Sequence, residues 1–337
     1  MPVATGRRAR TTARHSAPGD RGRARGKTAT NLWVVGALLL AVLSVAVLLN
    51  AIASQDGDDY DAEQAQQELE EEVAESAAPT AAEEAESIRV ALAGIAEDIS
   101  DEFGVSIGAT MRAGGGIIHV GDIQMTSALS SIKVPISMAA VQQAQVTGEP
   151  VESLREDIDA AIMASDNDAA LRLWESLGDE TEAAEKVSAV LHQGGDPTNA
   201  LTSQDENAYQ GFGDIHWSLD HQVIFANRMA CVNGADMVIG AMGQLIDEHS
   251  GGLGQLPDAH IKGGWGMTTD DEFILREFGL AGPAGSQVPL AVAVIPEDGT
   301  ESTAREAMAE MSSRIAPLVE ESSATGGDAD CQGVTAP

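Results

Sequence analysis

The chain has 337 residues and a formal net charge of −34. Binding to nucleic acid needs clustered positive charge that displaces counterions, so this composition argues against DNA or RNA as a partner. The charge is unevenly placed: residues 1–30 hold seven Arg, one Lys and one Asp, and residues 31–337 hold the other 11 basic and 52 acidic side chains. Such asymmetry indicates a targeting segment or two compartments rather than one uniform surface.

Residues 31–53 form an apolar segment without a charged side chain, made mostly of Leu, Val and Ala. A helix of about 20 such residues spans the hydrocarbon layer of a membrane. The basic residues 1–30 are expected to stay in the cytoplasm by the positive-inside rule. A cleaved signal peptide is the alternative, because Ala51 and Ala53 form an A-x-A-like site. The length of the apolar segment favours an uncleaved, single-pass anchor in the plasma membrane, and both interpretations place the rest of the chain outside the cytoplasm.

Residues 54–87 hold 13 acidic side chains and no basic one, which is typical of a solvated spacer without a core. Globular patterning begins near Ile88, where apolar residues recur at helical spacing as far as Phe103. Alternating residues over 105–111 and the run "IIHV" then predict a β-hairpin around a glycine-rich turn. The later predicted elements are helices over 130–146, 151–164, 168–193 and 218–247, a loop over 196–216, strands over 260–266, 272–280 and 288–295, and a helix over 302–318.

Two early strands, three late strands and helices between them predict one α/β domain over residues 88–320. Its sheet is expected to be assembled from both ends of the sequence, and the domain is long enough for a substantial core. Residues 321–337 are expected to form a flexible tail. The chain has two cysteines, Cys231 and Cys331, which in an exported protein form a disulfide more often than not. The alternative is one buried thiol and one thiol in the loose tail.

The stretch "SSIK" lies at the start of the helix predicted over 130–146, and Lys133 is one of only three lysines after residue 30. Side chains three residues apart share a helical face, so Lys133 faces Ser130 rather than Ser131. A lysine whose pKa is lowered by burial or by another cation can act as a base toward a serine hydroxyl. Backbone N–H groups at the helix start favour an oxyanion. A single such pair is more often an ordinary solvated surface.

Two further motifs follow. Ser165, Asp166 and Asn167 come at the end of a helix that returns antiparallel to the first, which brings Ser165 back to the level of Ser130 at 1.5 Å per residue. These residues also suit a simple helix cap. Lys262 precedes two glycines in a predicted strand, where glycine marks a close approach to the backbone, although an edge-strand charge is the plainer explanation.

Together the three motifs resemble the signatures S-x-x-K, S-D-N and K-T-G of the serine penicillin-recognising family, which includes class A β-lactamases and D,D-peptidases. They occur in the family's order, over residues 88–320, and the nearest type is an exported or membrane-anchored serine hydrolase of actinobacteria. The resemblance implies a five-stranded antiparallel sheet built from both chain ends with a helical subdomain. It implies no cofactor and no metal, and a small-molecule or cell-wall peptide substrate.

The resemblance also implies a role for each matched residue. Ser130 is the acylated nucleophile, Lys133 is the base or proton relay, and Ser165 passes the proton to the leaving nitrogen. Lys262 supplies positive potential for a substrate carboxylate and lowers the pKa of Lys133. The substrate-binding groups are the side chain of Asn167, the backbone at Gly264, and the N–H of Trp265, which shares the oxyanion with the N–H of Ser130; Asp166 is structural.

Two departures from the family pattern bear on function. Gly263 stands where the family has threonine, which removes a hydroxyl that helps to hold a substrate carboxylate. No E-x-x-L-N pattern for a deacylating glutamate occurs between residues 168 and 225, and Glu206 is only a weak substitute. These departures favour a peptidase, an esterase or a slowly turning penicillin binder over an efficient β-lactamase. The alternative function is a catalytically inactive descendant that binds peptidoglycan or an envelope partner.

Overall fold

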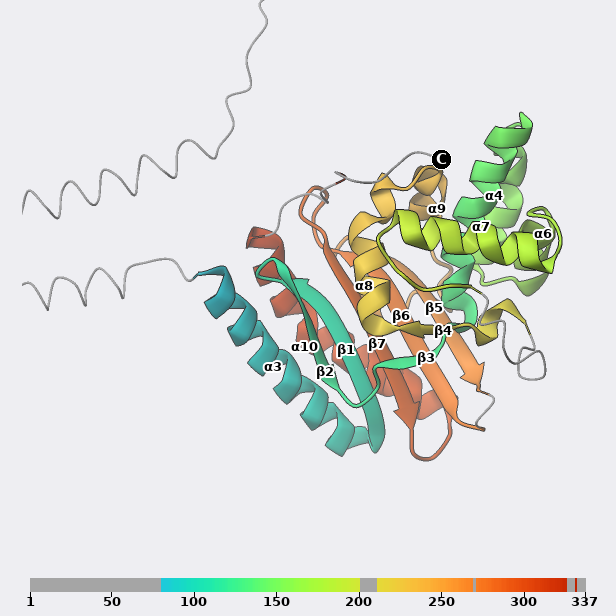
Figure 1. The fold of residues 1–337 in the computed structure, drawn as a ribbon. Helices are drawn as coiled ribbons and strands as arrows, with labels where there is room; N and C mark the ends of the chain where they lie inside the picture. Colours follow the sequence, from blue (N-terminus) through green and yellow to red (C-terminus); the bar gives the residue numbers. More distant parts are fainter. Residues whose placement is uncertain (1–79, 201–210, 269–270, 326–330, 332–337) are drawn as a thin grey trace, which may run out of the picture. The chain divides into compact units, whose positions relative to one another are not determined.

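A five-stranded antiparallel sheet is the centre of the computed structural model, in which residues 80–200, 211–268, 271–325 and 331 are described. Its strand order is β2-β1-β7-β6-β5 (Figure 1). The early hairpin joins the late strands through β1 and β7, where Ala109 lies opposite Val292. The predicted sheet from both chain ends is therefore confirmed. The strands are β1 (Val105–Ala113), β2 (Gly116–Gly121), β5 (His260–Met267), β6 (Phe273–Ala281) and β7 (Val288–Pro296).

Helices cover both faces of this sheet (Figure 1). They are α3 (Ala81–Phe103), α4 (Lys133–Thr147), α5 (Arg155–Met163), α6 (Asn167–Glu175), α7 (Glu180–Gln193), α8 (Leu219–Arg228), α9 (Ala235–Met242) and α10 (Glu301–Thr325). Short 3-10 turns are η1 (Leu129–Ile132), η2 (Val151–Leu154), η3 (Phe212–Asp214), η4 (Met229–Cys231) and η5 (Gly252–Gln255).

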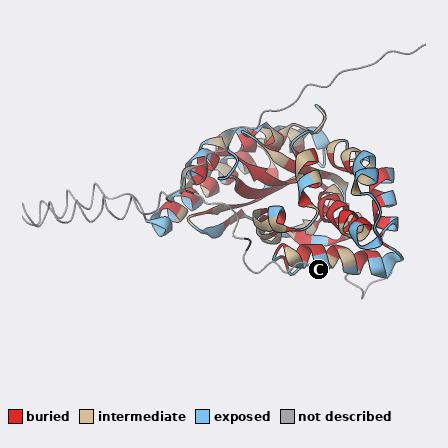
Figure 2. Ribbon diagram, turned by 90° about the horizontal axis from the view of Figure 1, so that it is seen from above, coloured by how far each residue is buried: buried red, intermediate tan, exposed pale blue. Residues whose placement is uncertain are grey.

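Each face of the sheet has its own hydrophobic core (Figure 2). On one face α3 and α10 pack on side chains such as Leu275 and Val292. On the other face α8 lies against β1, β6 and β7, and the helical subdomain α4–α9 shares a core with Phe278 and Ala291. Adjacent strand residues point to opposite faces, so the fully or nearly fully buried strands β6 and β7 supply apolar side chains to both cores.

The first and last helices of the described domain extend beyond the predicted ones. Helix α3 begins at Ala81, not near Ile88, because Thr80 and Glu83 form a capping box and acidic residues suit a helix N-terminus. Helix α10 continues to Thr325, past the predicted boundary at 320. The predicted basic segment, membrane helix and most of the acidic spacer lie outside the described residues. Among the described helices, none combines the length and apolar character that a membrane span requires.

Several predicted helices are interrupted. The run over 168–193 breaks at Gly178, whose φ of +125° suits only glycine, and Asp179 then caps α7. The run over 218–247 breaks at Gly234, with a φ of +86°. The sequence also gave no sign of β3 (Met125–Ser127) and β4 (His216–Ser218), which pair as a small second sheet.

A disulfide joins Cys231, at the end of η4, to Cys331 beyond α10. The predicted pairing of the two cysteines is thereby confirmed. The bond closes a loop with a sequence separation of 100 residues, and it fixes the end of the chain to the helical subdomain.

Candidate active site

The turn before α4 presents two neighbouring serines in different ways. Ser130 is partly exposed, whereas Ser131 is fully buried and its hydroxyl donates to the carbonyl of Ala128. Leu129 has a φ of +49°, a left-handed conformation that a leucine adopts only under constraint. The exposed hydroxyl of this pair therefore belongs to Ser130, the serine that the spacing to Lys133 selects.

Lys133 is the first residue of α4 and its side chain is 1% exposed. Its Nζ donates to the Ser165 carbonyl at 2.6 Å, to Asn167 Oδ1 at 2.7 Å and to Ser165 Oγ at 3.4 Å. Among the described residues, Lys133 Nζ has these partners and makes no hydrogen bond to Ser130 Oγ. The amine is thus held by Ser165 and Asn167 of the S-D-N motif.

Lys262 on β5 reaches the same hydroxyl from the sheet. Lys262 is 2% exposed, and its Nζ donates to Ser165 Oγ at 2.9 Å and to the carbonyl of Gly263 at 2.7 Å. Ser165 is therefore the point where the two buried amines meet. The structure brings Lys133, Ser165, Asn167 and Lys262 together, as the motif order predicts.

Burial lowers the pKa of Lys133 to about 8, and the nearby Asp166 carboxylate opposes part of this shift. The pKa of Lys262 is lowered well below its usual value, first by burial and then by the charge of Lys133. The cause thus differs from the expectation that Lys262 lowers the pKa of Lys133.

The S-D-N motif combines a structural and a positioning element. Asp166 is the N-cap of α6, and its Oδ1 accepts from the N–H of Ala169 at 2.6 Å. Ser165 has a φ of +55°, an unusual backbone conformation for serine, and it directs its carbonyl and hydroxyl toward Lys133. Capping and active-site geometry therefore coexist in this motif.

At Gly264, strand β5 lies directly against the turn that carries Ser130. A Cβ on Gly264 would lie 2.8 Å from Ser130 N and 2.9 Å from Leu129 Cβ, so only glycine fits. A Cβ on Gly263 would meet nothing nearer than Glu277 Cγ at 3.6 Å. Packing therefore requires the glycine at 264 and leaves room for a larger residue at 263.

The ring of Trp265 points away from this contact, toward the core shared with α10. His249 lies 4.7 Å from its ring centroid, and the Arg305 guanidinium carbon lies 5.0 Å above it. Burial and the charges of Lys262 and Arg305 lower the pKa of His249, although its bond to the Met163 carbonyl opposes this. The weak candidate Glu206 lies outside the described residues.

Charged residues in strand β6 were overlooked in the sequence. Arg276 is completely buried on the site's side of the sheet, and Glu277 is buried on the other side. Burial raises the pKa of Glu277 to about 7, and its Oε2 accepts from the N–H of Leu253 at 2.6 Å. The signal was available, because two charges interrupt the otherwise apolar run "FILREFGLA".

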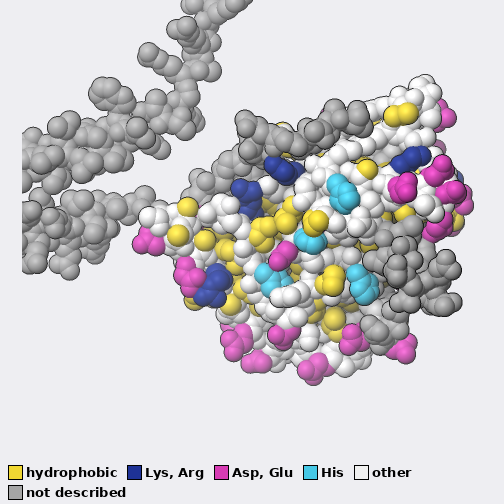
Figure 3. Space-filling model, in the orientation of Figure 1, with side chains coloured by type: hydrophobic (Ala, Val, Ile, Leu, Met, Phe, Trp, Pro, Cys, Tyr) yellow, Lys and Arg dark blue, Asp and Glu magenta, His cyan; other side chains and the backbone are white. Residues whose placement is uncertain are grey.

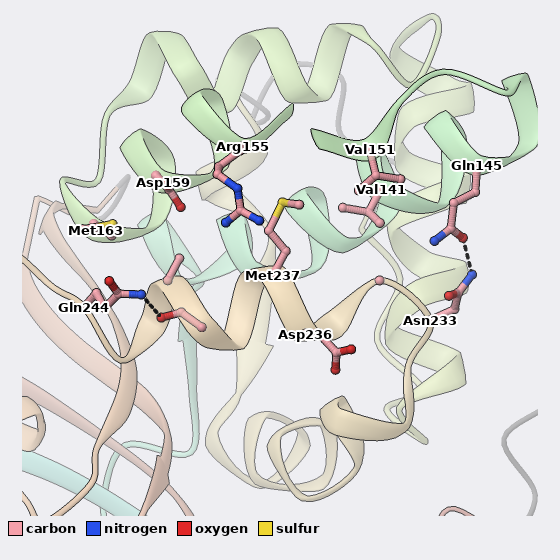
Figure 4. Close-up of a pocket in the computed structure, with 13 residues that line it drawn as sticks. Val141, Gln145, Val151, Arg155, Asp159, Met163, Asn233, Asp236, Met237 and Gln244 are labelled. Carbon is pink, nitrogen blue, oxygen red and sulfur yellow. Dashed lines mark hydrogen bonds between the residues drawn. The ribbon is translucent and has the colours of Figure 1, made fainter. Parts of the chain in front are cut away.

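A cavity of about 600 Å³ lies elsewhere, between α4, α5 and α9 (Figure 4). Asn233 donates to Gln145 at one end of it, and Arg155 and Asp159 line its wall. None of the motif residues lines this cavity. Within the described ranges, no three His, Cys, Asp or Glu side chains are grouped to hold a metal ion.

No family model and no curated protein matches the sequence. Among solved structures, the chain is similar to a representative class A beta-lactamase from Bacteroides cellulosilyticus DSM 14838, with a TM-score of 0.54 and 16% identity over 67% of this chain and 97% of that one. It is also similar to a putative class A beta-lactamase, PenP, from Rhodopseudomonas palustris, with a TM-score of 0.52 and 14% identity over 68% and 99% of the two chains. A class A beta-lactamase from Mycobacterium abscessus gives a TM-score of 0.50 and 16% identity over 67% and 98%.

The chain therefore has the fold of the serine penicillin-recognising proteins, with an antiparallel sheet and a helical subdomain. At these identities the similarity shows the fold alone. The chemistry of this particular site has to be argued from its own residues.

Proposed function

We propose that the protein is a serine hydrolase that works through an acyl-enzyme at Ser130. The observation that carries the proposal is the convergence of two buried amines, Lys133 and Lys262, on the hydroxyl of Ser165, beside an exposed serine in a constrained turn. Surface lysines do not explain this arrangement, because both side chains are buried at a cost to their charged forms.

In the proposed reaction, neutral Lys133 accepts the proton of Ser130 Oγ while that oxygen attacks the substrate carbonyl carbon. The proton then passes through Ser165 Oγ to the leaving nitrogen or oxygen as the acyl bond breaks. The N–H groups of Ser130 and Trp265 bind the oxyanion, and Asn167 binds the substrate amide. Water hydrolyses the acyl-enzyme in a second step.

The substrate class that we propose is an amide in a cell-wall peptide or a β-lactam. Gly263 offers no hydroxyl to a substrate carboxylate, and the Lys262 amine is already bonded to Ser165 and Gly263. Penicillin is therefore expected to acylate the protein slowly.

The alternative is an inactive descendant that binds peptidoglycan or an envelope partner, and it is favoured by Gly263 and by the missing E-x-x-L-N glutamate. Mass spectrometry after treatment with a fluorophosphonate or a fluorescent penicillin separates the two functions. An adduct on Ser130 that is lost in Ser130→Ala and retained in Ser131→Ala supports the hydrolase. A folded protein without an adduct from any acylating probe refutes the hydrolase. If an adduct forms, the rate of nitrocefin turnover separates a β-lactamase from a slow penicillin binder.

We further propose that residues 31–53 anchor the protein in the plasma membrane, with residues 1–30 in the cytoplasm and the hydrolase domain outside. The proposal rests on the uncharged apolar run after an arginine-rich segment. Protease treatment of intact spheroplasts is expected to digest the domain and spare the basic segment. Protection of the domain until the cells are lysed would contradict this orientation.

A further inference from the structure

Arg276 lies in the middle of β6 with no exposed surface. Its guanidinium makes no ion pair with a carboxylate of the described residues. A buried charge of this kind is costly unless its donors are satisfied.

The guanidinium donates to two segments of the chain that are far from Arg276 in the sequence, residues 126–127 and 217–222. Nη1 donates to the carbonyls of Thr126 at 3.0 Å and Ser127 at 2.8 Å, which belong to β3. Nη2 donates to the carbonyl of Trp217 in β4 at 3.0 Å and to Oε1 of Gln222 in α8. One side chain therefore fixes the small β3–β4 sheet and α8 to the central sheet.

The network continues to the nucleophile's turn. Gln222 Nε2 donates to Ser131 Oγ at 3.1 Å, and that hydroxyl donates to the carbonyl of Ala128. Between Ala128 and Ser130 lies Leu129, with its left-handed backbone. A residue in this strained conformation persists only where its surroundings determine its backbone angles.

The turn at residues 128–130 also packs against strand β5 of the central sheet. Arg276 lies opposite Gly264 in the pairing of β6 with β5, and Gly264 is the residue that contacts Ser130 N. Arg276 thus stands one strand behind the contact between β5 and the nucleophile, and its donors hold the chain that leads into the turn. Arg276 is thus linked both to β5, through its pairing with Gly264, and to the residues before the turn, through its hydrogen bonds.

We infer that Arg276 is a positioning residue for the nucleophile, acting through Gln222 and Ser131 to hold the strained turn that presents Ser130 to β5. The inference rests on the proposed acylation of Ser130. The two neighbouring serines then have different roles. Ser130 reacts, and Ser131 links Gln222, which binds the buried guanidinium, to the carbonyl of Ala128 in the turn.

The test is the rate of acylation by a fluorophosphonate, measured over a range of probe concentrations in the full-length protein. Ser131→Ala is expected to lower the limiting acylation rate constant roughly 10- to 100-fold with little change in probe affinity, because misplacement of the nucleophile acts on the chemical step. Ser188→Ala is the matched control. Its hydroxyl also bridges a carbonyl and an N–H, those of Ala184 and Ala200, but on α7 away from the turn.

Arg276→Lys and the double variant complete a cycle. If the two residues act through one network, their effects on the rate constant are less than additive. Additive effects would overturn the role given to Arg276, and a wild-type rate constant in folded Ser131→Ala would overturn the inference as a whole. If Arg276→Lys does not fold, Gln222→Met takes its place in the cycle, because Gln222 is the link between Arg276 and Ser131.

Hydrogen exchange separates this inference from the proposed function. If the wild-type protein is not acylated, the proposed function fails, and the exchange of amides over residues 126–133 still reports on the turn. Faster exchange there in Ser131→Ala, but not in Ser188→Ala, supports the positioning role. Unchanged exchange in both variants refutes it.

Discussion

The buried amine of Lys133 is predicted to lower the free energy of unfolding of the protein, although the proposed reaction needs this amine as its base. Its pKa falls from 10.5 to about 8 because the charged amine is buried. A shift of that size corresponds to about 3 kcal/mol of unfolding free energy lost wherever the amine is protonated in both states, which is below about pH 8. Replacement by methionine, which has a similar length and no charge, removes this cost.

The expected gain is smaller than the full cost. Lys133→Met removes the donor to the Ser165 carbonyl and to Asn167, and an unsatisfied polar group costs about 1–3 kcal/mol. Asn167 is exposed and regains water, so one group at most is left unpaired. We therefore expect Lys133→Met to raise the free energy of unfolding at pH 7 by about 1–2 kcal/mol, while acylation falls about 100-fold or more.

The sign of the pH dependence follows from proton binding. Between about pH 8 and 10.5 the unfolded chain binds more protons at Lys133 than the folded chain, so wild-type stability rises with pH across this window. The advantage of Lys133→Met is thus largest at pH 7 and shrinks toward pH 10. Urea unfolding at several pH values measures this difference directly.

Lys186→Met is the control, because it also removes one positive charge from an acidic protein. The Lys186 amine is only half-buried and donates to the Leu177 carbonyl, so we expect no gain in stability. Two results would contradict this reasoning: Lys133→Met is less stable than the wild type at every pH, or the difference in stability does not change with pH. Either result would show that burial does not lower the pKa of Lys133, and the proposed mechanism would then lack its base.

Three further results are expected. Acylation by a fluorophosphonate should rise roughly tenfold from pH 7 to pH 9 with an apparent pKa of about 8, because the neutral amine of Lys133 is the base, and Lys133→Arg should be slow throughout; a flat wild-type profile would count against this base. Gly264→Ala should slow acylation about tenfold or more, because its Cβ would clash with the Ser130 turn, whereas Gly263→Ala should not; equal effects would contradict the contact. Cys331→Ser should lower the unfolding free energy by about 2–4 kcal/mol, and equal denaturation curves for this variant and the oxidised wild type would show that the disulfide does not stabilise the domain.

Local sequence patterns predicted much of the fold. The alternation in β1 and β2, and the long apolar runs of β6 and β7, gave the strands, because burial imposes periodicity on the chain itself. The errors fell at the ends and breaks. The starts of α3 and α7 depend on capping side chains, and the break before α9 depends on the left-handed backbone of Gly234. Such features are short, and helical periodicity on either side conceals them.

The site was predicted in the same way, only as far as its contacts are local. The spacing of Ser130 and Lys133 selected Ser130 over Ser131, because three residues return to one helical face, and in the structure Ser130 is the less buried of the two serines. The spacing did not show that burial is the main cause of the lowered pKa of Lys133, because burial depends on the depth at which the amine lies. Spacing carries no information about depth.

By itself the sequence determined the three motifs, their order, the sheet drawn from both ends of the chain, and the cysteine pair. Those depend on residue type and on periodicity along the chain. Only the tertiary structure decided that both amines meet at Ser165, that Gly264 contacts the turn of Ser130, and that Arg276 holds this turn from behind. These contacts join residues up to 150 positions apart, and such a distance is closed only when the two cores pack on the sheet.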